Sequence, residues 1–305
     1  MGNLVTIALP TYNGASKYIN EAIESCLAQT HTNWELIVVD DTSTDNTPEV
    51  MASWCERDER IRYVRHEVNK RLPGALNTAI ATMRGDYFTW VSDDDLFRPN
   101  ALEVMVNYLE THNEVDLVYT DYSEIDAEGE IIRRIEVGLP EELGIHNVIG
   151  VCHLRRRKVL DTIGGYSEEF FLVEDIDFWI RAACNFSIAP YHEDLFLYRQ
   201  HGGSLTSAHS KRVYPIYEEV LARHREAMHW MTPDKWAYAY LRLAKRAFMV
   251  RDYKRMLHYA GTAVKASPSY FIKKSIAKLS AVIRTGSHLS ESPVPTSSAQ
   301  HGGKA

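Results

Sequence analysis

The sequence predicts an α/β protein in which a mainly parallel, Rossmann-like sheet is flanked by helices and followed by an α-helical C-terminal extension. Short apolar runs alternate with amphipathic segments over the first 120 residues, which is typical of a parallel sheet with right-handed helical crossovers. From about residue 213 the apolar residues recur at helical spacing instead. The 305 residues suffice for one large domain with an appendage.

Each predicted element has its own local signals. The first apolar run ends at Pro10, and the helix after the second run begins at Thr47 and Pro48, residue types that favour the N-cap and N1 positions. We expect strands over 4–10, 34–39, 61–64, 87–91 and 115–119, and helices over 18–29, from 47, over 74–83 and over 99–111. Beyond residue 120 we expect an antiparallel strand over 131–137, a helix from Glu174 and a strand over 195–199.

Charge is distributed unevenly along the chain. The net charge of −7 is the sum of −17 over residues 1–233 and +10 over residues 234–284. An acidic body argues against nucleic acid as a partner, whereas a basic helical region favours an anionic surface. We therefore predict a catalytic α/β domain over 1–212, a helical region over 213–284 and a disordered tail rich in Ser, Pro and Gly over 285–305.

Composition also bears on location. No apolar run approaches the roughly 18 residues that span a bilayer, and the first residues lack a basic leader. The four cysteines are far apart and show no metal-ligand spacing, which predicts reduced thiols in a cytoplasmic protein. Residues 271–283 predict a basic amphipathic helix, for which packing on the α/β domain and peripheral docking on the inner face of a membrane both stay open.

Three consecutive carboxylates end the run over 87–91. Two unit charges about 4 Å apart repel by roughly 4 kcal/mol near a protein surface, so Asp93, Asp94 and Asp95 favour a bound cation. Hard cations such as Mg²⁺ or Mn²⁺ take oxygen ligands, and Mg²⁺ typically adds substrate phosphates. The alternative is a solvated acidic turn, but Pro99 reads as the first residue of the next helix, which puts the triplet too far upstream to cap it.

Polar clusters follow the first, second and fourth predicted strands. They are 11–13, 40–45 and 92–95. Ligands of open parallel sheets bind outside the carboxyl ends of the strands, so these clusters should meet on one rim. Each cluster alone could be ordinary turn chemistry, but three at equivalent strand ends favour a binding site.

These motifs together resemble the family-two inverting glycosyltransferases with the GT-A fold. The resemblance covers roughly residues 3–205 and rests on Ala8 to Asn13, Val39 to Asp45, Gly85 to Tyr87, Ser92 to Asp95 and the pair Glu174 and Asp175. It implies a nucleotide-sugar donor, usually a UDP-sugar, a divalent Mn²⁺ or Mg²⁺, and transfer to an acceptor hydroxyl with inversion at the anomeric carbon.

The resemblance also implies roles for individual residues. Asp175, in the pair with Glu174, would be the catalytic base, and Asp41, or else Asp40, would accept a hydrogen bond from the nucleotide base. The nucleotide-binding set would be Pro10, Thr11, Tyr12, Asn13, Asp40, Asp41, Arg71, Asp93 and Asp94, and the metal ligands would come from Asp93, Asp94, Asp95 and His201.

Two departures from the family pattern affect these roles. Many relatives have an acid where Ser92 stands, so the resemblance does not say which aspartate of the triplet is the direct ligand. Arg71 stands where a glycine is usual and Leu76 where an arginine is usual. Arg71 thereby becomes a candidate to contact the base or the diphosphate.

Acceptor and rival functions remain open at the level of sequence. Surface polysaccharide, lipid-linked oligosaccharide and protein are all open as acceptors. The segment from Val151 to Lys158, which ends in a basic run, could hold an acceptor or its phosphate or form a solvated helix face. A nucleotidyltransferase is disfavoured because no glycine-rich, lysine-bearing loop follows the first strand. The other alternative is a non-catalytic scaffold that senses nucleotide and binds a membrane or partner through its basic helices.

Overall fold

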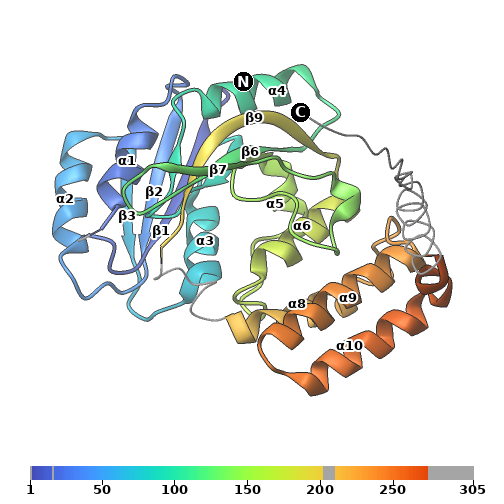
Figure 1. The fold of residues 1–305 in the computed structure, drawn as a ribbon. Coiled ribbons are helices and arrows are strands. Elements are labelled where there is room, and N and C mark those ends of the chain that lie inside the picture. The colour runs from blue at the N-terminus through green and yellow to red at the C-terminus, as the bar shows by residue number, and fades with distance from the viewer. Residues whose placement is uncertain (1, 16, 202–209, 274–305) are drawn as a thin grey trace, which may run out of the picture.

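The computed structural model describes residues 2–15, 17–201 and 210–273 (Figure 1). Its nine strands form one sheet with the order β3-β2-β1-β4-β8-β6-β9-β5, and β7 pairs with β6 off this path. Helices cover both faces of the sheet, and three C-terminal helices lie beside it as a separate group. The predicted α/β fold with a helical extension is confirmed.

The first half of the sheet is parallel, as predicted. Its strands are β1 (Val5–Thr11), β2 (Trp34–Asp40), β3 (Ile61–Arg65) and β4 (Tyr87–Trp90). Every residue of β2 is buried, because helices cover both faces of this part of the sheet. The crossover helices are α1 (Ile19–Leu27), α2 (Thr47–Arg57) and α3 (Arg71–Thr82), followed by α4 (Ala101–Thr111).

The second half of the sheet contains strands that the sequence did not predict. It consists of β5 (Leu96–Phe97), β6 (Leu117–Ile125), β7 (Ile131–Ile135), β8 (His153–Arg156) and β9 (Ile188–Arg199). Strand β8 runs antiparallel between β4 and β6, while β7 is the antiparallel strand expected over 131–137. Helices α5 (Arg157–Ile163) and α6 (Glu174–Asn185) complete this half, and a short 3-10 turn, η1 (Pro140–Glu142), precedes β8.

The basic side chains at the end of the segment 151–158 contact other parts of the protein, so acceptor binding by this segment stays a prediction. Arg155 is fully buried, with its guanidinium 4.4 Å from the ring centre of Phe178 and 4.8 Å from that of Phe88. Arg156 donates to the carbonyl oxygen of Val115 (3.1 Å), and Lys158 pairs with Asp116 (2.5 Å). Cation–π contacts and local pairs therefore account for this run.

The C-terminal helices pack against α6 of the α/β part of the chain. Helices α8 (Ser210–Arg223), α9 (Pro233–Met249) and α10 (Tyr253–Ala266) share an apolar core with α6, in which Ile176 and Ile180 meet Val220 and Trp236. The predicted boundary between residues 212 and 213 falls inside α8, and the division into domains stays a prediction. The tail over 285–305 and most of the helix expected over 271–283 lie outside the described residues. Among the described helices, none is long and apolar enough to cross a bilayer.

A buried carboxylate ties α8 to α6. Asp177 lies 2.8 Å from Nε of Arg181 and 2.7 Å from Nε2 of His224, the residue after α8. Removing one member of a buried charged group leaves its partners without compensation. We expect Asp177→Ala to lower the free energy of unfolding by about 2 to 3 kcal/mol, measured by urea denaturation.

The matched control for this substitution is Asp161→Ala. Asp161 pairs with Arg157 at 3.8 Å on the surface, where such pairs contribute about 0 to 1 kcal/mol. Equal losses for the two variants would show that Asp177 does not hold the helical region in place.

Candidate active site

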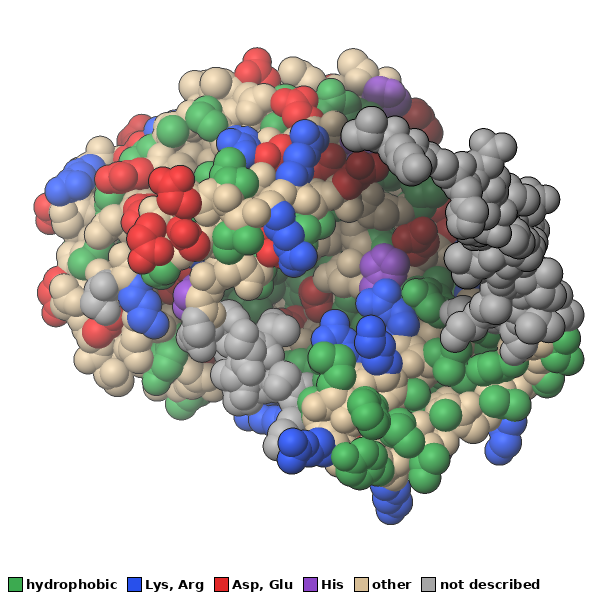
Figure 2. Space-filling model, viewed as in Figure 1, with side chains coloured by type: hydrophobic (Ala, Val, Ile, Leu, Met, Phe, Trp, Pro, Cys, Tyr) green, Lys and Arg blue, Asp and Glu red, His purple; other side chains and the backbone are tan. Residues whose placement is uncertain are grey.

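A cavity of about 720 Å³ lies where the carboxyl ends of β1 and β4 meet α3 and the start of α6. It contains residues from all three polar clusters together with Glu174, Asp175 and His201. Figure 2 shows a hollow near the middle of the molecule with acidic side chains inside and Lys and Arg side chains along its lower edge. The three strand-end clusters therefore meet on one rim, as the parallel sheet requires.

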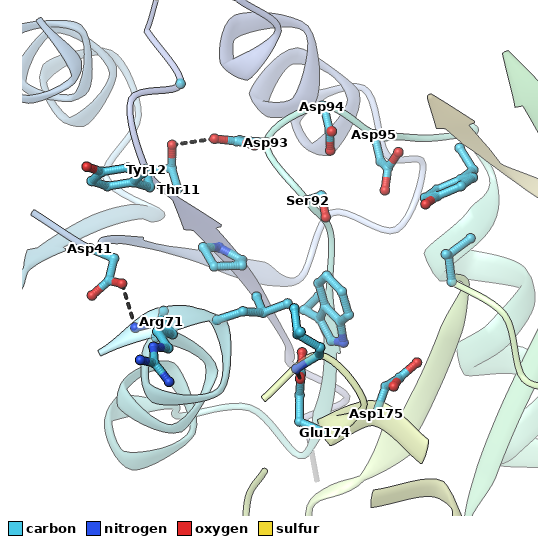
Figure 3. A pocket seen from close by; sticks show the side chains of 18 of the residues that line it. Thr11, Tyr12, Asp41, Arg71, Ser92, Asp93, Asp94, Asp95, Glu174 and Asp175 are labelled. Atoms are coloured by element: carbon cyan, nitrogen blue, oxygen red, sulfur yellow. Dashed lines mark hydrogen bonds between the residues drawn. The ribbon is translucent and has the colours of Figure 1, made fainter. Parts of the chain in front are cut away.

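The end of β1 forms one wall of the cavity. Thr11 donates a hydrogen bond from Oγ1 to Oδ2 of Asp93 (2.6 Å), which joins β1 to the acidic triplet (Figure 3). Asn13 has a φ of 57°, and its Oδ1 accepts a hydrogen bond from the backbone N–H of Thr44 (2.7 Å). A Cβ on Gly14 would lie 2.5 Å from both Thr11 Oγ1 and Asp93 Oδ2, so glycine permits this close approach.

Asp41 lines the cavity, but most of its hydrogen-bonding capacity is used within the protein. Its Oδ1 accepts from the backbone N–H of Lys70 and lies 2.7 Å from Nδ1 of His66, while its Oδ2 accepts from the backbone N–H of Arg71 (2.7 Å). A carboxylate offers about four lone-pair positions. One position on Oδ2 therefore remains for a ligand.

Asp40, the alternative partner for the nucleotide base, is placed elsewhere. It is fully buried and absent from the cavity wall. Its Oδ1 accepts from the backbone N–H of Ser43 (2.7 Å), and its Oδ2 accepts from the hydroxyl of Tyr63 (2.5 Å). The expectation that Asp40 contacts nucleotide is wrong for this geometry, because strand β2 ends with its side chain turned into the sheet.

Arg71 begins α3 beside Asp41 and projects its guanidinium over the ring of Phe171, 5.0 Å from the ring centre. Its φ of 62° is unusual for a residue with a side chain. This conformation is held by the bond from its N–H to Asp41. The exposed side chain of Arg71 and the carboxylate of Asp41 therefore line the same part of the cavity (Figure 3).

The three aspartates of the triplet point in different directions. Asp93 faces Thr11, Asp94 Oδ2 lies 2.7 Å from Nε2 of His201, and Asp95 Oδ1 accepts from the backbone N–H of Arg199 (2.8 Å). Burial raises the pKa of Asp93 to about 6, with a further contribution from the charge of Asp94. Burial also raises the pKa of Asp95 well above its usual range.

Arg199 fixes the loop that carries the triplet. Its buried side chain donates from Nε to the carbonyl oxygen of Asp94 (2.9 Å) and pairs with Glu21 at 2.6 Å. It also stacks 4.2 Å from the ring centre of Tyr18. The end of β9 therefore determines where the side chains of the triplet point.

The residues of the cavity wall supply part of the ligand set that a divalent cation needs. The described part of the chain gathers no group of three or more His, Cys, Asp or Glu side chains as ligands. Asp94 and His201 nevertheless bring an oxygen and a nitrogen together at 2.7 Å on the cavity wall. Mg²⁺ and related ions are commonly held by one or two protein groups and completed by substrate phosphates and water, and this pair fits such a site.

Glu174 and Asp175 begin α6 on the opposite side of the cavity from the triplet (Figure 3). Burial raises the pKa of Asp175 to about 6, whereas burial and the charge of Asp175 raise that of Glu174 to about 8. Asp175 Oδ2 accepts from Nδ2 of Asn147 (2.8 Å), and its Oδ1 accepts from the N–H of Ile176 (2.8 Å). Burial thus favours the protonated form of both groups, and more strongly for Glu174 than for Asp175. Asp175 is therefore the better candidate of the two to accept a proton near neutral pH.

Glu174 has a structural contact that the sequence did not indicate. Its Oε2 accepts from the backbone N–H of Leu172 (2.6 Å), a residue with a φ of 88°. A leucine in this region of φ is strained. Glu174 therefore stabilises the segment that carries Phe171 into the cavity.

The model of glycosyl transferase family 2 matches residues 6–164, which include the end of β1 and the acidic triplet. The chain belongs to this family. An uncharacterized glycosyltransferase of Rickettsia felis is 32% identical over 285 residues, covering 86% of this chain and 45% of that protein. One from Rickettsia typhi is 35% identical over 215 residues, covering 67% of this chain and 66% of that protein. The family 2 chain thus spans less than half the length of the R. felis relative.

Solved structures confirm the GT-A fold. TarS from S. aureus, residues 1–349 in complex with UDP-GlcNAc, superposes with a TM-score of 0.64 at 18% identity, covering 86% of this chain and 81% of that one. The mannosyltransferase PcManGT from Pyrobaculum calidifontis, in complex with GDP-Man and Mn²⁺, gives a TM-score of 0.60 at 18% identity, with coverages of 93% and 79%. At this identity the likeness concerns the fold alone.

Several residues of this family 2 site were not predicted from the sequence. Asn147 and Phe171 lie in segments without periodicity, so no pattern identified them. Arg199 stands two residues before the predicted His201, but nothing in the sequence indicated that its guanidinium is buried. Tyr122 and Tyr198 line the cavity from β6 and β9, and no alternation of buried and exposed residues marks either position.

Proposed function

We propose that this chain transfers a sugar from a nucleoside-diphosphate-sugar donor to an acceptor hydroxyl with inversion at the anomeric carbon. The first candidate donor is a UDP-sugar. The observation that carries the proposal is the position of the Asp175 carboxylate, which accepts a hydrogen bond from Asn147 and lies across the cavity from the acidic triplet. A base on one side and a diphosphate site on the other are what a single displacement at the sugar carbon needs. The TarS complex with UDP-GlcNAc supports a nucleotide-sugar donor, and the PcManGT complex makes a GDP-sugar the second candidate.

In the proposed reaction the donor nucleoside lies along Pro10, Thr11, Tyr12 and Asn13. The open position on Asp41 accepts a hydrogen bond from the base, and Arg71 contacts the base or the diphosphate. Asp93, fixed by Thr11, faces the ribose. These residues hold the donor with its anomeric carbon toward α6.

Asp175 performs the proton transfer in this proposal. Its carboxylate takes the proton of the acceptor hydroxyl while that oxygen bonds to the anomeric carbon from the side opposite the diphosphate. The bond between the sugar and the diphosphate breaks, and the diphosphate leaves with the electron pair. Asn147 orients the carboxylate through its 2.8 Å hydrogen bond.

We assign the metal site to Asp94 and His201, with Asp93 as a neighbouring oxygen and Asp95 as the residue that anchors the loop. When bound there, Mn²⁺ or Mg²⁺ would supply Lewis-acid stabilisation of the leaving diphosphate. The Mn²⁺ in the PcManGT complex supports the use of a divalent cation, while the choice of residues rests on the contact between Asp94 and His201.

The proposed setting is the synthesis of a surface polysaccharide or another glycoconjugate in the cytoplasm. All four cysteines are free, which suits a reducing compartment. The first experiment is a thermal-shift and calorimetric panel of UDP, dTDP, GDP and CMP, each with Mn²⁺, Mg²⁺ or chelator. A nucleotide at one hundred times its dissociation constant should stabilise the protein by about 2.7 kcal/mol. Stabilisation by none of them would overturn the transferase proposal in favour of a non-catalytic role.

The pH dependence of transfer offers a separate test of the base. Because Asp175 acts in its ionised form and its pKa is raised to about 6, kcat/KM should fall as the pH drops below about 6. Below that pH, kcat/KM should fall by nearly tenfold for each pH unit, measured at a saturating metal concentration. A limb near pH 8 would instead assign the proton transfer to Glu174.

A further inference from the structure

The outer side of the C-terminal helices carries apolar side chains that face solvent. Tyr253, Leu257 and Val264 lie on one side of α10, and Phe248 and Met249 at the end of α9 continue this surface across the turn. These five side chains, which we call the α10 face, are between 48% and 67% exposed. Figure 2 shows hydrophobic side chains gathered over the region of α9 and α10. Such a contiguous apolar surface marks an interaction site.

The exposure of this face does not come from loose packing of α10. Tyr259 and Ala263, on another side of the same helix, are fully buried in the core shared with α9 and α6. The ring of Phe248 lies 6.2 Å from that of Tyr253, so the two helices also meet at their turn. Helix α10 therefore has two apolar sides. One side packs into the core, and the other is exposed to solvent.

Cations surround the α10 face. The exposed side chains of Lys245, Arg246, Arg251, Lys254 and Lys265 take part in no ion pair within the described residues. The acids of α9 and α10, with the turn between them, are already paired. Asp234 lies 3.2 Å from Lys273, and Asp252 lies 2.9 Å from Arg255. The partner of this surface should therefore be apolar and anionic at once.

We propose that the α10 face docks on an anionic membrane surface. Its apolar side chains would enter the headgroup region while the surrounding lysines and arginines contact lipid phosphates, the arrangement of helices that lie in a membrane interface. An acidic protein would need carboxylates placed against each cation, whereas a lipid surface meets dispersed cations without such matching. The proposal does not depend on the chemistry of the cavity, which lies on the other side of α6.

The test is sedimentation of the full chain with phosphatidylcholine vesicles prepared with and without phosphatidylglycerol. We expect binding only to the anionic vesicles, weakened by salt. The double variant Phe248→Glu with Leu257→Glu should bind at least about tenfold more weakly. The double variant Lys254→Gln with Lys265→Gln should lose about 30-fold, since each cation near the surface contributes about 1 kcal/mol.

Matched controls lie on other faces of the molecule. Ile132→Glu replaces an exposed residue of β7, and the double variant Arg57→Gln with Arg84→Gln removes two exposed cations elsewhere. Vesicle binding that does not need phosphatidylglycerol, or that falls equally in the controls, would overturn the proposal. So would a Leu257-dependent dimer in ultracentrifugation, which would assign the face to a second copy. UDP affinity should stay unchanged in all four variants, so a failed vesicle experiment is separable from a failed donor site.

Discussion

Asp175→Asn is expected to reduce sugar transfer by roughly 10²- to 10⁴-fold while the affinity for the donor nucleotide stays within about twofold. The amide cannot accept the acceptor proton, but it keeps the size of the side chain and the oxygen that accepts from the N–H of Ile176. Thr11, Tyr12 and Asp41, which we propose contact the donor, lie across the cavity from Asp175 (Figure 3), so donor binding should not depend on the charge of Asp175. Transfer of labelled sugar and calorimetry with UDP measure the two effects on the same preparation.

The control for this variant is Glu168→Gln, which changes an exposed acid in the segment before α6. A second variant, Asn147→Ala, separates catalysis from positioning. It removes the 2.8 Å hydrogen bond to Asp175 Oδ2 and should shift the acidic limb of the pH profile while leaving transfer measurable. Normal turnover by Asp175→Asn would remove Asp175 from the mechanism.

The parallel half of the fold could be predicted because its strands bury both faces. Apart from Glu35, strand β2 is an apolar run until Asp40, and the alternation with helices fixes the crossovers. Strand β8 could not be predicted in this way. Its residues His153 and Arg155 look like part of a solvated segment, and only the tertiary aromatic cluster around Arg155 explains why both are fully buried.

The sequence predicted which residues lie near one another in the cavity, but not which way their side chains point. The ends of parallel strands must share one rim, so Thr11, Asp41 and Asp93 could be placed in one cavity from sequence order alone. Sequence order does not say which way a carboxylate turns. Asp40 and Asp41 are adjacent, yet Asp40 is buried outside the cavity and Asp41 lines it, because successive side chains along an extended chain point in opposite directions.

Asp94→Ala is expected to weaken metal-dependent nucleotide binding by at least about 100-fold, with little change in the weaker binding that persists in chelator. Among the three aspartates of the triplet, only Asp94 faces His201. Their 2.7 Å contact brings a candidate oxygen ligand and a candidate nitrogen ligand together. Loss of the carboxylate leaves a single protein ligand, which holds Mn²⁺ or Mg²⁺ poorly without its partner. Titration of UDP with and without Mn²⁺ by calorimetry gives both affinities directly.

Two comparisons make the Asp94 result specific. Asp86→Ala removes an exposed acid just before β4 and should leave the metal effect intact. Asp95→Ala should lower thermal stability, because it removes the buried oxygen that accepts from the N–H of Arg199, yet retain metal dependence. If Asp94→Ala keeps full metal dependence and Asp93→Ala loses it, the ligand is the carboxylate that Thr11 holds. The hydrogen bond between Thr11 and Asp93 would then have to break when the donor binds, so that metal binding would be coupled directly to the end of β1.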